Sequence, residues 1–153
     1  MLGFFKKKPE NYFSVVEKQL ITDAIQKAEH RTSGEIRVFI EGNCPDSDPV
    51  SRAKIIFSQL QMANTAARNG VLVYVAMKSK KLAVFGDQGI HEKVGDQFWE
   101  TQVKLILQHF NKNNYAEGIA GIIQEIGEAL ATHFPYDETG DKNELPDDIV
   151  FGN

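Results

Sequence analysis

Cysteine is almost missing from this sequence, since Cys44 is the only one in 153 residues. A single thiol forms no intrachain disulfide, no Cys-x-x-Cys redox pair and no thiolate zinc cage. Long apolar runs are also missing, because no stretch approaches the roughly 20 residues that a membrane-spanning helix requires. The first residues carry their lysines after their apolar residues and lack the apolar core of a secretory signal. We therefore expect a soluble, cytoplasmic protein.

An excess of positive charge is missing as well. The chain has 17 Lys and Arg against 21 Asp and Glu, a net charge of -4 and a pI near 5.6. Because nucleic-acid binding needs a clustered basic face, we expect no nucleic-acid partner. The N-terminal segment 1–13 is basic and aromatic through Phe4, Phe5 and Lys6–Lys8. A weak peripheral contact with an anionic membrane is the alternative there to a solvated terminus.

The common catalytic motifs are absent too. The sequence contains no Gly-x-Ser-x-Gly elbow, no P-loop and no dinucleotide fingerprint, and His91-Glu92 lacks the second histidine of a zinc protease. Residues 46–50 match the bare Asp-x-Asp-x-Val pattern of aspartyl-phosphate phosphatases. Asp48 directly precedes Pro49, however, which favours a helix cap over a nucleophile.

What is present fits one globular domain with a core, since 42% of the residues are hydrophobic and 25% charged. Ser14 and Glu17 have the spacing of a capping box, and Asp48 and Asn114 are further helix-start signals. Apolar spacing predicts helices over about 15–30, 49–67, 90–110 and 115–134, and strands over 35–41, 71–77 and 81–86.

The predicted core comes from the apolar positions of these elements. The run 71–77 is nearly all apolar, which is typical of a central strand covered on both faces. The other inward-facing residues are predicted to be Val16, Leu20, Ala24 and Ala28, flanked by Ile21 and Ile25; Ile36, Val38 and Ile40; Val50, Ala53, Ile56, Leu60 and Ala67; Val94, Phe98, Trp99, Val103, Ile106 and Phe110; and Ile119, Ile122, Ile123, Ile126 and Leu130.

The order of the elements predicts the fold class. The strand–helix–strand unit 35–77 should be parallel and right-handed, and the short connection 78–80 makes the third strand antiparallel to the second. We expect an α/β fold, a three-layer α/β/α sandwich with a small mixed sheet of three to four strands and about four helices. The domain should span 14–134, followed by an acidic tail, 135–153. That tail is either disordered or clips back onto the body through Leu145 and Ile149–Phe151.

Three polar segments should meet at one edge of this sheet, because two parallel strands start there and the antiparallel strand returns to it. The third helix also begins at that edge, and its free N–H groups attract anions. The carboxylates there favour a hard cation such as Ca²⁺ or Mg²⁺, with Glu35, Asp87, Glu92 and Asp96 as metal ligands. The predicted pocket residues are Ser33, Gly34, Glu35, Arg68, Asn69, Gly70, Gly86, Asp87 and Gly89.

The order of the same segments resembles the TPM domain family, named for thylakoid-lumen, photosystem-repair and receptor-modulating proteins. The resemblance covers about 14–134 and rests on residues 32–38, 69–76 and 86–92 and on Phe110 followed by 115–119; the ending 143–148 is similar to short soluble members. It implies an α/β/α sandwich, a weak acid phosphatase activity in plant members, and roles in assembly or repair of membrane complexes. Arg68, where many members have an acidic residue, and the longer loop 86–92 depart from the family pattern.

Two functions stay open. The first is a small binding or accessory module that acts through an unknown protein partner, with the strand-edge pocket offering room for a cation. The alternative is metal-assisted phosphomonoester hydrolysis, with Asp87 and Glu35 as ligands, Glu92 or Asp96 in support, and the helix start holding phosphate.

Overall fold

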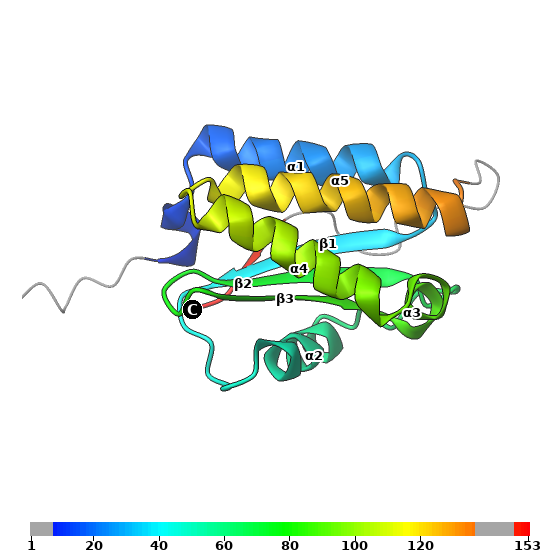
Figure 1. The fold of residues 1–153 in the computed structure, drawn as a ribbon, viewed down its shortest axis with the longest axis horizontal. Coiled ribbons are helices and arrows are strands. Elements are labelled where there is room, and N and C mark those ends of the chain that lie inside the picture. Colours follow the sequence, from blue (N-terminus) through cyan, green and yellow to red (C-terminus); the bar gives the residue numbers. More distant parts are fainter. Residues whose placement is uncertain (1–7, 137–148) are drawn as a thin grey trace, which may run out of the picture.

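A computed structural model describes residues 8–136 and 149–153 and is shown in Figure 1. The predictions for residues 1–7, including the membrane contact of Phe4, Phe5 and the lysines, and for the tail residues 137–148 lie outside the described residues. The elements in chain order are η2 (Pro9–Tyr12), α1 (Val15–Glu29), β1 (Glu35–Glu41), α2 (Pro49–Gln59), β2 (Gly70–Ala76), β3 (Lys81–Gly86), α3 (Gln88–Val94), α4 (Asp96–Phe110), α5 (Tyr115–His133) and β4 (Val150–Phe151).

The sheet is mixed, with strand order β3-β2-β1-β4. β1 pairs with β2 in parallel, from Glu35 opposite Gly70 to Glu41 opposite Ala76. β3 runs antiparallel to β2, with Gly86 opposite Val71. The predicted parallel unit and hairpin are therefore confirmed, and β2 is the central strand, buried along its whole length.

Helices cover both faces of the sheet, which confirms the three-layer α/β/α fold. In Figure 1, α1, α4 and α5 lie above the sheet and α2 lies below it. The larger core joins these three helices to the upper face of the sheet and includes Ile21, Ile36 and Ile126. The smaller core lies against α2 and includes Phe57, Leu72 and Tyr74. No helix in residues 8–136 is both long and apolar enough to cross a membrane.

Two predicted helix starts have the expected caps and a third does not. Ser14 and Glu17 form the capping box of α1. Asp48 caps α2 by accepting from the Val50 N–H at 3.0 Å, which confirms the structural interpretation of the Asp-x-Asp segment. α5 begins after Asn114 as predicted, but the Asn114 side chain makes no capping bond.

The predicted third helix is two helices. Gly95, with φ of 79°, ends α3 and begins α4, so the described residues contain five α-helices where about four were predicted. A positive φ of this size is easy only for glycine, and it breaks the helical path. Apolar spacing missed the break because it continues on both sides of Gly95.

Parts of the core prediction were wrong at element ends. Val16 and Leu20 are 78% and 41% exposed, whereas Ile21, Ile25 and Ala28, which were also predicted, make the buried face of α1. α2 ends at Gln59, so Ala67 lies outside it and is exposed, and Val50 is 42% exposed. β1 was predicted to bury one face, but all seven of its residues are buried. On the second face, Phe39 belongs to the smaller core and Glu41 is bonded to Arg52 of α2.

The end of the chain joins the sheet. Val150 and Phe151 form β4, parallel to β1, with Phe39 opposite Val150 and Ile40 opposite Phe151. The Gly152 N–H donates to the Ile40 carbonyl at 2.8 Å. Of the two possibilities for Ile149–Phe151, clipping back onto the body is the one that the structure confirms.

Candidate functional site at the strand edge

The three polar segments meet at one edge of the sheet, as their topology predicted. Glu35 at the start of β1 lies opposite Gly70 at the start of β2. The Asp87 N–H, directly after β3, donates to the Gly70 carbonyl at 2.9 Å. The Glu35 N–H donates to the Asn69 carbonyl at 3.3 Å. Backbone hydrogen bonds therefore hold the ends of all three strands together.

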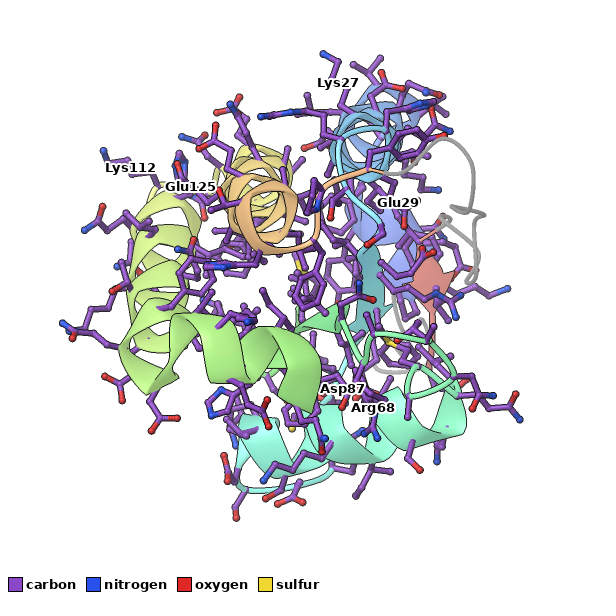
Figure 2. All side chains as sticks on the ribbon, turned by 90° about the vertical axis from the view of Figure 1, so that its right-hand side faces the viewer. Lys27, Glu29, Arg68, Asp87, Lys112 and Glu125 are labelled. Carbon is purple, nitrogen blue, oxygen red and sulfur yellow. The ribbon has the colours of Figure 1, made fainter. Side chains whose placement is uncertain are left out.

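Asp87 and Arg68 dominate the polar chemistry of this edge. Arg68 Nε lies 2.6 Å from Asp87 Oδ2, and Arg68 Nη2 lies 2.8 Å from Asp87 Oδ1. Figure 2 shows the two side chains next to each other on the α2 side of the molecule. The Asp87 side chain is only 5% exposed, while that of Arg68 is 44% exposed. The hydrogen bond to Asp87 raises the pKa of Arg68 above its ordinary value. This two-bond geometry satisfies both carboxylate oxygens.

The start of α3 does not present the free N–H groups that were predicted to bind an anion. Asp87 is the N-cap of this seven-residue helix, and its Oδ1 accepts from the Gln88 N–H at 2.8 Å. The Gly89 N–H donates to the Arg68 carbonyl at 2.8 Å. Two of the first three N–H groups of α3 are thus engaged inside the protein. A carboxylate already stands where a phosphate was expected, and it opposes a second anion.

Two of the predicted pocket glycines are required by close packing. A Cβ on Gly89 would lie 2.1 Å from the Ala67 carbonyl oxygen and 2.6 Å from that of Arg68. A Cβ on Gly86 would lie 2.2 Å from Trp99 Cζ2. Both distances are far below van der Waals contact. Gly89 therefore lets α3 approach the loop before β2, and Gly86 lets the Trp99 indole cover the end of β3.

The segment before β1 is tied to the end of α5. Thr32 Oγ1 donates to the Phe134 carbonyl and accepts from the Gly34 N–H at 3.0 Å. The Ser33 N–H donates to the same Phe134 carbonyl at 3.0 Å. A Cβ on Gly34 would lie 2.7 Å from Leu130 Cδ2. Gly34 and the Ser33 backbone therefore position β1 against α5, which is a structural role that the sequence did not indicate.

Asn69 and Glu35 are the most deeply buried polar residues of the predicted pocket, at 1% and 2% exposure. The Asn69 N–H donates to Thr65 Oγ1 at 3.3 Å, and Asn69 Nδ2 lies 3.4 Å from Ser33 Oγ. The side-chain oxygen of Asn69 accepts no hydrogen bond from the described residues. A buried acceptor of this kind is where an ordered water or a small donor would bind.

The four predicted metal ligands have different surroundings. Glu35 is buried and Asp87 is paired with Arg68, whereas Glu92 is exposed and Asp96 lies near His91, with 3.4 Å between Asp96 Oδ1 and His91 Nε2. In the part of the chain that the structure describes, no three His, Cys, Asp or Glu side chains form a group that holds a metal ion. The described residues thus do not assemble the predicted Ca²⁺ or Mg²⁺ site.

A pocket of about 490 Å³ lies beside Asp87 and extends along the end of β3. Val84, Phe85 and Trp99 line it, together with Lys54 of α2 and Glu100 of α4. The Trp99 Nε1–H donates to His91 Nδ1 at 2.9 Å, which places the indole at the pocket wall. Sequence reasoning missed Trp99 and His91 as pocket residues because the helical spacing assigned Trp99 to the core. No local signal pairs them, because eight residues of a continuous helix would separate them by about 12 Å along its axis.

A family model described as the TPM domain matches residues 7–129, most of the chain. This chain belongs to the TPM domain family. The resemblance seen in segments 32–38, 69–76 and 86–92 is therefore confirmed. A search of curated proteins found no match.

Solved structures share the fold of this TPM domain. The NMR structure of the BA42 protein from the psychrophilic bacterium Bizionia argentinensis is 40% identical, with a TM-score of 0.84 over 94% of this chain and 97% of that chain. The N-terminal domain of a protein from P. gingivalis matches with a TM-score of 0.68 and 15% identity over 88% and 99%. The N-terminal domain of the cg2496 protein from Corynebacterium glutamicum matches with 0.62 and 13% over 77% and 74%. The identities of 15% and 13% to the latter two domains show a shared fold alone.

A second buried polar cluster in this TPM domain lies at the opposite end of β1. Arg52 Nε and Nη2 donate to the two Glu41 carboxylate oxygens, each at 2.9 Å. The Tyr74 hydroxyl also donates to Glu41. Burial first, and then this hydrogen bond, raise the pKa of Tyr74 well above its ordinary value. The hydrogen bonds among these three side chains pair the buried carboxylate of Glu41 and link α2 to the sheet.

A second hollow of the TPM domain, about 760 Å³, lies between α1 and α5. Small residues of both helices line it, including Ala24, Ala28 and Gly121. At the start of α1, Val15 and Val16 are 81% and 78% exposed. The described surface therefore has exposed apolar side chains away from the strand edge as well.

Proposed function

We propose that this TPM domain is a small binding module that acts through contacts with other proteins. One observation carries the proposal: the pocket beside Asp87 presents apolar side chains and a strand edge, while the carboxylate next to it is already paired with Arg68. Val84, Phe85 and Trp99 give the pocket an apolar lining. An apolar centre with charged groups at its margin matches the anatomy of a protein interface, in which a polar rim surrounds an apolar core.

The polar groups at the strand edge support binding over catalysis. Asp87 is bonded twice to Arg68 and once to the Gln88 N–H, and it caps α3. A carboxylate held in this way is poorly placed to bind a metal ion or to transfer a proton, because another cation would have to displace Arg68. The exposed apolar residues Val15 and Val16 favour the same conclusion from a second surface.

Affinity capture from an extract of the source cells tests this proposal. The tagged wild-type chain should enrich the same protein or proteins in repeated experiments, compared with an unrelated protein of similar size and net charge. The control variant Lys112→Glu/Glu125→Lys keeps the net charge and changes only exposed residues outside both hollows (Figure 2). It should capture the same partners as the wild type. Failure of the wild-type chain to enrich any protein contradicts the proposal.

A further inference from the structure

β3 is an edge strand whose outer side has no neighbouring strand in the described residues. The sheet order places β2 on one side of β3 and ends there. In antiparallel pairs, alternate residues point their backbone N–H and C=O toward the partner, and the residues between them point away. The phase of this alternation decides which residues of β3 present free backbone groups.

The hydrogen bond from the Asp87 N–H to the Gly70 carbonyl fixes that phase. With the observed register, Phe85 and Ala83 also exchange their bonds with β2. The bonds between β2 and β1 agree with this phase. The Met77 N–H, directly after β2, donates to the Glu41 carbonyl, so the odd-numbered residues of β2 face β1 and its even-numbered residues face β3. The backbone groups of Leu82, Val84 and Gly86 therefore point to the outer side of β3.

Helices on both faces of the sheet turn this edge into a groove. α2 contributes Val50 and Lys54 from one side, and α4 contributes Trp99 and Glu100 from the other. Figure 1 shows β3 running between α4 above it and α2 below it. Val84 and Phe85, whose side chains belong to the two different cores, line the same pocket. An unpaired strand edge with apolar groups on both sides matches an extended peptide, which adds as one more strand.

We propose that β3 binds an extended segment of a partner protein as an additional strand, through the backbone groups of Leu82, Val84 and Gly86. This inference rests on the proposed protein-binding function and names its surface and mode. Alternate side chains of the added strand face the α2 side, near Phe85 and Val50, and the α4 side, near Trp99. Apolar residues in the partner segment therefore suit both sides.

Charge complementarity narrows the chemistry of the segment further. Lys54 stands on the α2 side of the pocket, and Asp96 and Glu100 stand on the α4 side. Because neighbouring residues of a strand face opposite sides, an acidic residue toward Lys54 and a basic residue toward Glu100 are separated by an odd number of positions. The fitting segment is thus extended and apolar, with one acidic and one basic residue at odd spacing.

The same charges disfavour antiparallel pairing with β3 of a second copy. A two-fold axis perpendicular to the sheet relates antiparallel edge strands, so it places α2 beside α2 and α4 beside α4. Lys54 then approaches its own copy, and Asp96 and Glu100 approach theirs. Like charges that face each other across a strand pair are destabilising. A segment of a different protein meets no such repulsion.

Selection from a phage-displayed library of random seven-residue peptides against the full chain tests the proposal. Selected peptides should share an apolar pattern with opposite charges at odd spacing. Val84→Pro removes the outward N–H at the centre of the edge, where proline is compatible with an edge strand, and should weaken binding about tenfold or more. The control variant Lys112→Glu/Glu125→Lys leaves β3 and its pocket unchanged, so it should bind the selected peptides like the wild type.

The peptides provide a second test that needs no protein variant. N-methylation of the selected peptide at every other residue should weaken binding about tenfold, while methylation of the residues between should have little effect. Absence of any selected peptide, equal binding by Val84→Pro, or uniform effects of N-methylation would overturn the strand proposal. A β3-mediated dimer that Val84→Pro dissociates would overturn it too.

The capture experiment separates this inference from the function on which it rests. If wild-type and Val84→Pro chains capture the same protein equally well, strand addition at β3 is wrong and the binding function stands. If the wild-type chain captures no protein, the binding function itself fails.

Discussion

The guanidinium of Arg68 donates to both carboxylate oxygens of Asp87, at 2.6 and 2.8 Å, across the start of β2. Asp87 in turn caps α3, and the Arg68 carbonyl accepts from the Gly89 N–H. Arg68 has φ of 52°, an uncommon conformation for a residue with a side chain. The loop before β2 and the start of α3 therefore form one bonded unit, and Asp87 has a structural role that does not depend on a ligand.

Removal of one partner should show this coupling. Arg68→Met leaves a nearly buried carboxylate without its cation, so it should lower stability more in the wild-type background than in the Asp87→Asn background. Asp87→Ala should be less stable than Asp87→Asn by about 1 kcal/mol, because asparagine keeps an oxygen that caps α3. Urea unfolding of the four variants measures both differences. Additive effects of Arg68→Met and Asp87→Asn would show that the pair is not coupled.

Phosphatase assays with and without Mg²⁺ or Ca²⁺ separate the binding function from the hydrolase alternative. Because Asp87 is paired with Arg68, we expect no metal-dependent turnover of a phosphomonoester above that of a protein-free control. The hydrolase alternative predicts the opposite result, a metal-dependent activity that both Asp87→Ala and Glu35→Ala abolish. Activity that neither substitution changes would leave these two carboxylates without a catalytic role.

Two glycines with opposite surroundings make a matched test of packing. Gly89→Ala places a methyl group against two backbone carbonyls that have little room to move, so we expect a loss near the upper end of about 1–3 kcal/mol. Gly121→Ala in α5 meets nothing within 4 Å and should be neutral or stabilising by up to about 1 kcal/mol. Thermal unfolding of both variants is the measurement. Equal stability of the two variants would contradict the close approach at Gly89.

Tyr74 makes the stability of the fold sensitive to alkaline pH. Its pKa is raised in the folded protein by burial and by the hydrogen bond to Glu41. Above a pH of about 10 the unfolded chain ionises this tyrosine while the folded chain keeps it protonated, so stability falls by up to about 1.4 kcal/mol per pH unit. Below that pH the contribution of this group is fully present.

Tyr74→Phe isolates this effect from the other groups that titrate at high pH. The variant should lose about 1.5–3 kcal/mol at neutral pH, because the carboxylate of Glu41 loses a hydrogen bond. Its stability should then fall less steeply than that of the wild type above pH 10. Parallel curves of unfolding free energy against pH for the two proteins would refute the role of Tyr74.

Local sequence patterns determined most of the secondary structure and the location of the strand edge. The alternation of residues 35–41, the continuous apolar run 71–77 and a helical period of about 3.6 residues placed the strands and most helix segments. The parallel strand–helix–strand unit and the antiparallel return of the third strand predicted that Gly34-Glu35, Asn69-Gly70 and Gly86-Asp87 meet at one edge. The segments that carry the TPM resemblance lie in these same places, since the fold and the edge depend on them.

Tertiary structure decided what those residues do at the edge. The sequence shows Arg68 and Asp87 separated by 19 positions, and only the positive φ at Arg68 and the return of β3 bring them into contact. In the sequence Gly86 looks like an ordinary turn glycine, and only the Trp99 ring packed against it in the fold shows why a side chain is excluded there. The full burial of β1 and the open outer side of β3 likewise depend on which layers cover each strand. Periodicity records the order of apolar and polar residues along one segment. Which partner buries a residue, or leaves a strand edge unpaired, is set by contacts between segments far apart in the chain.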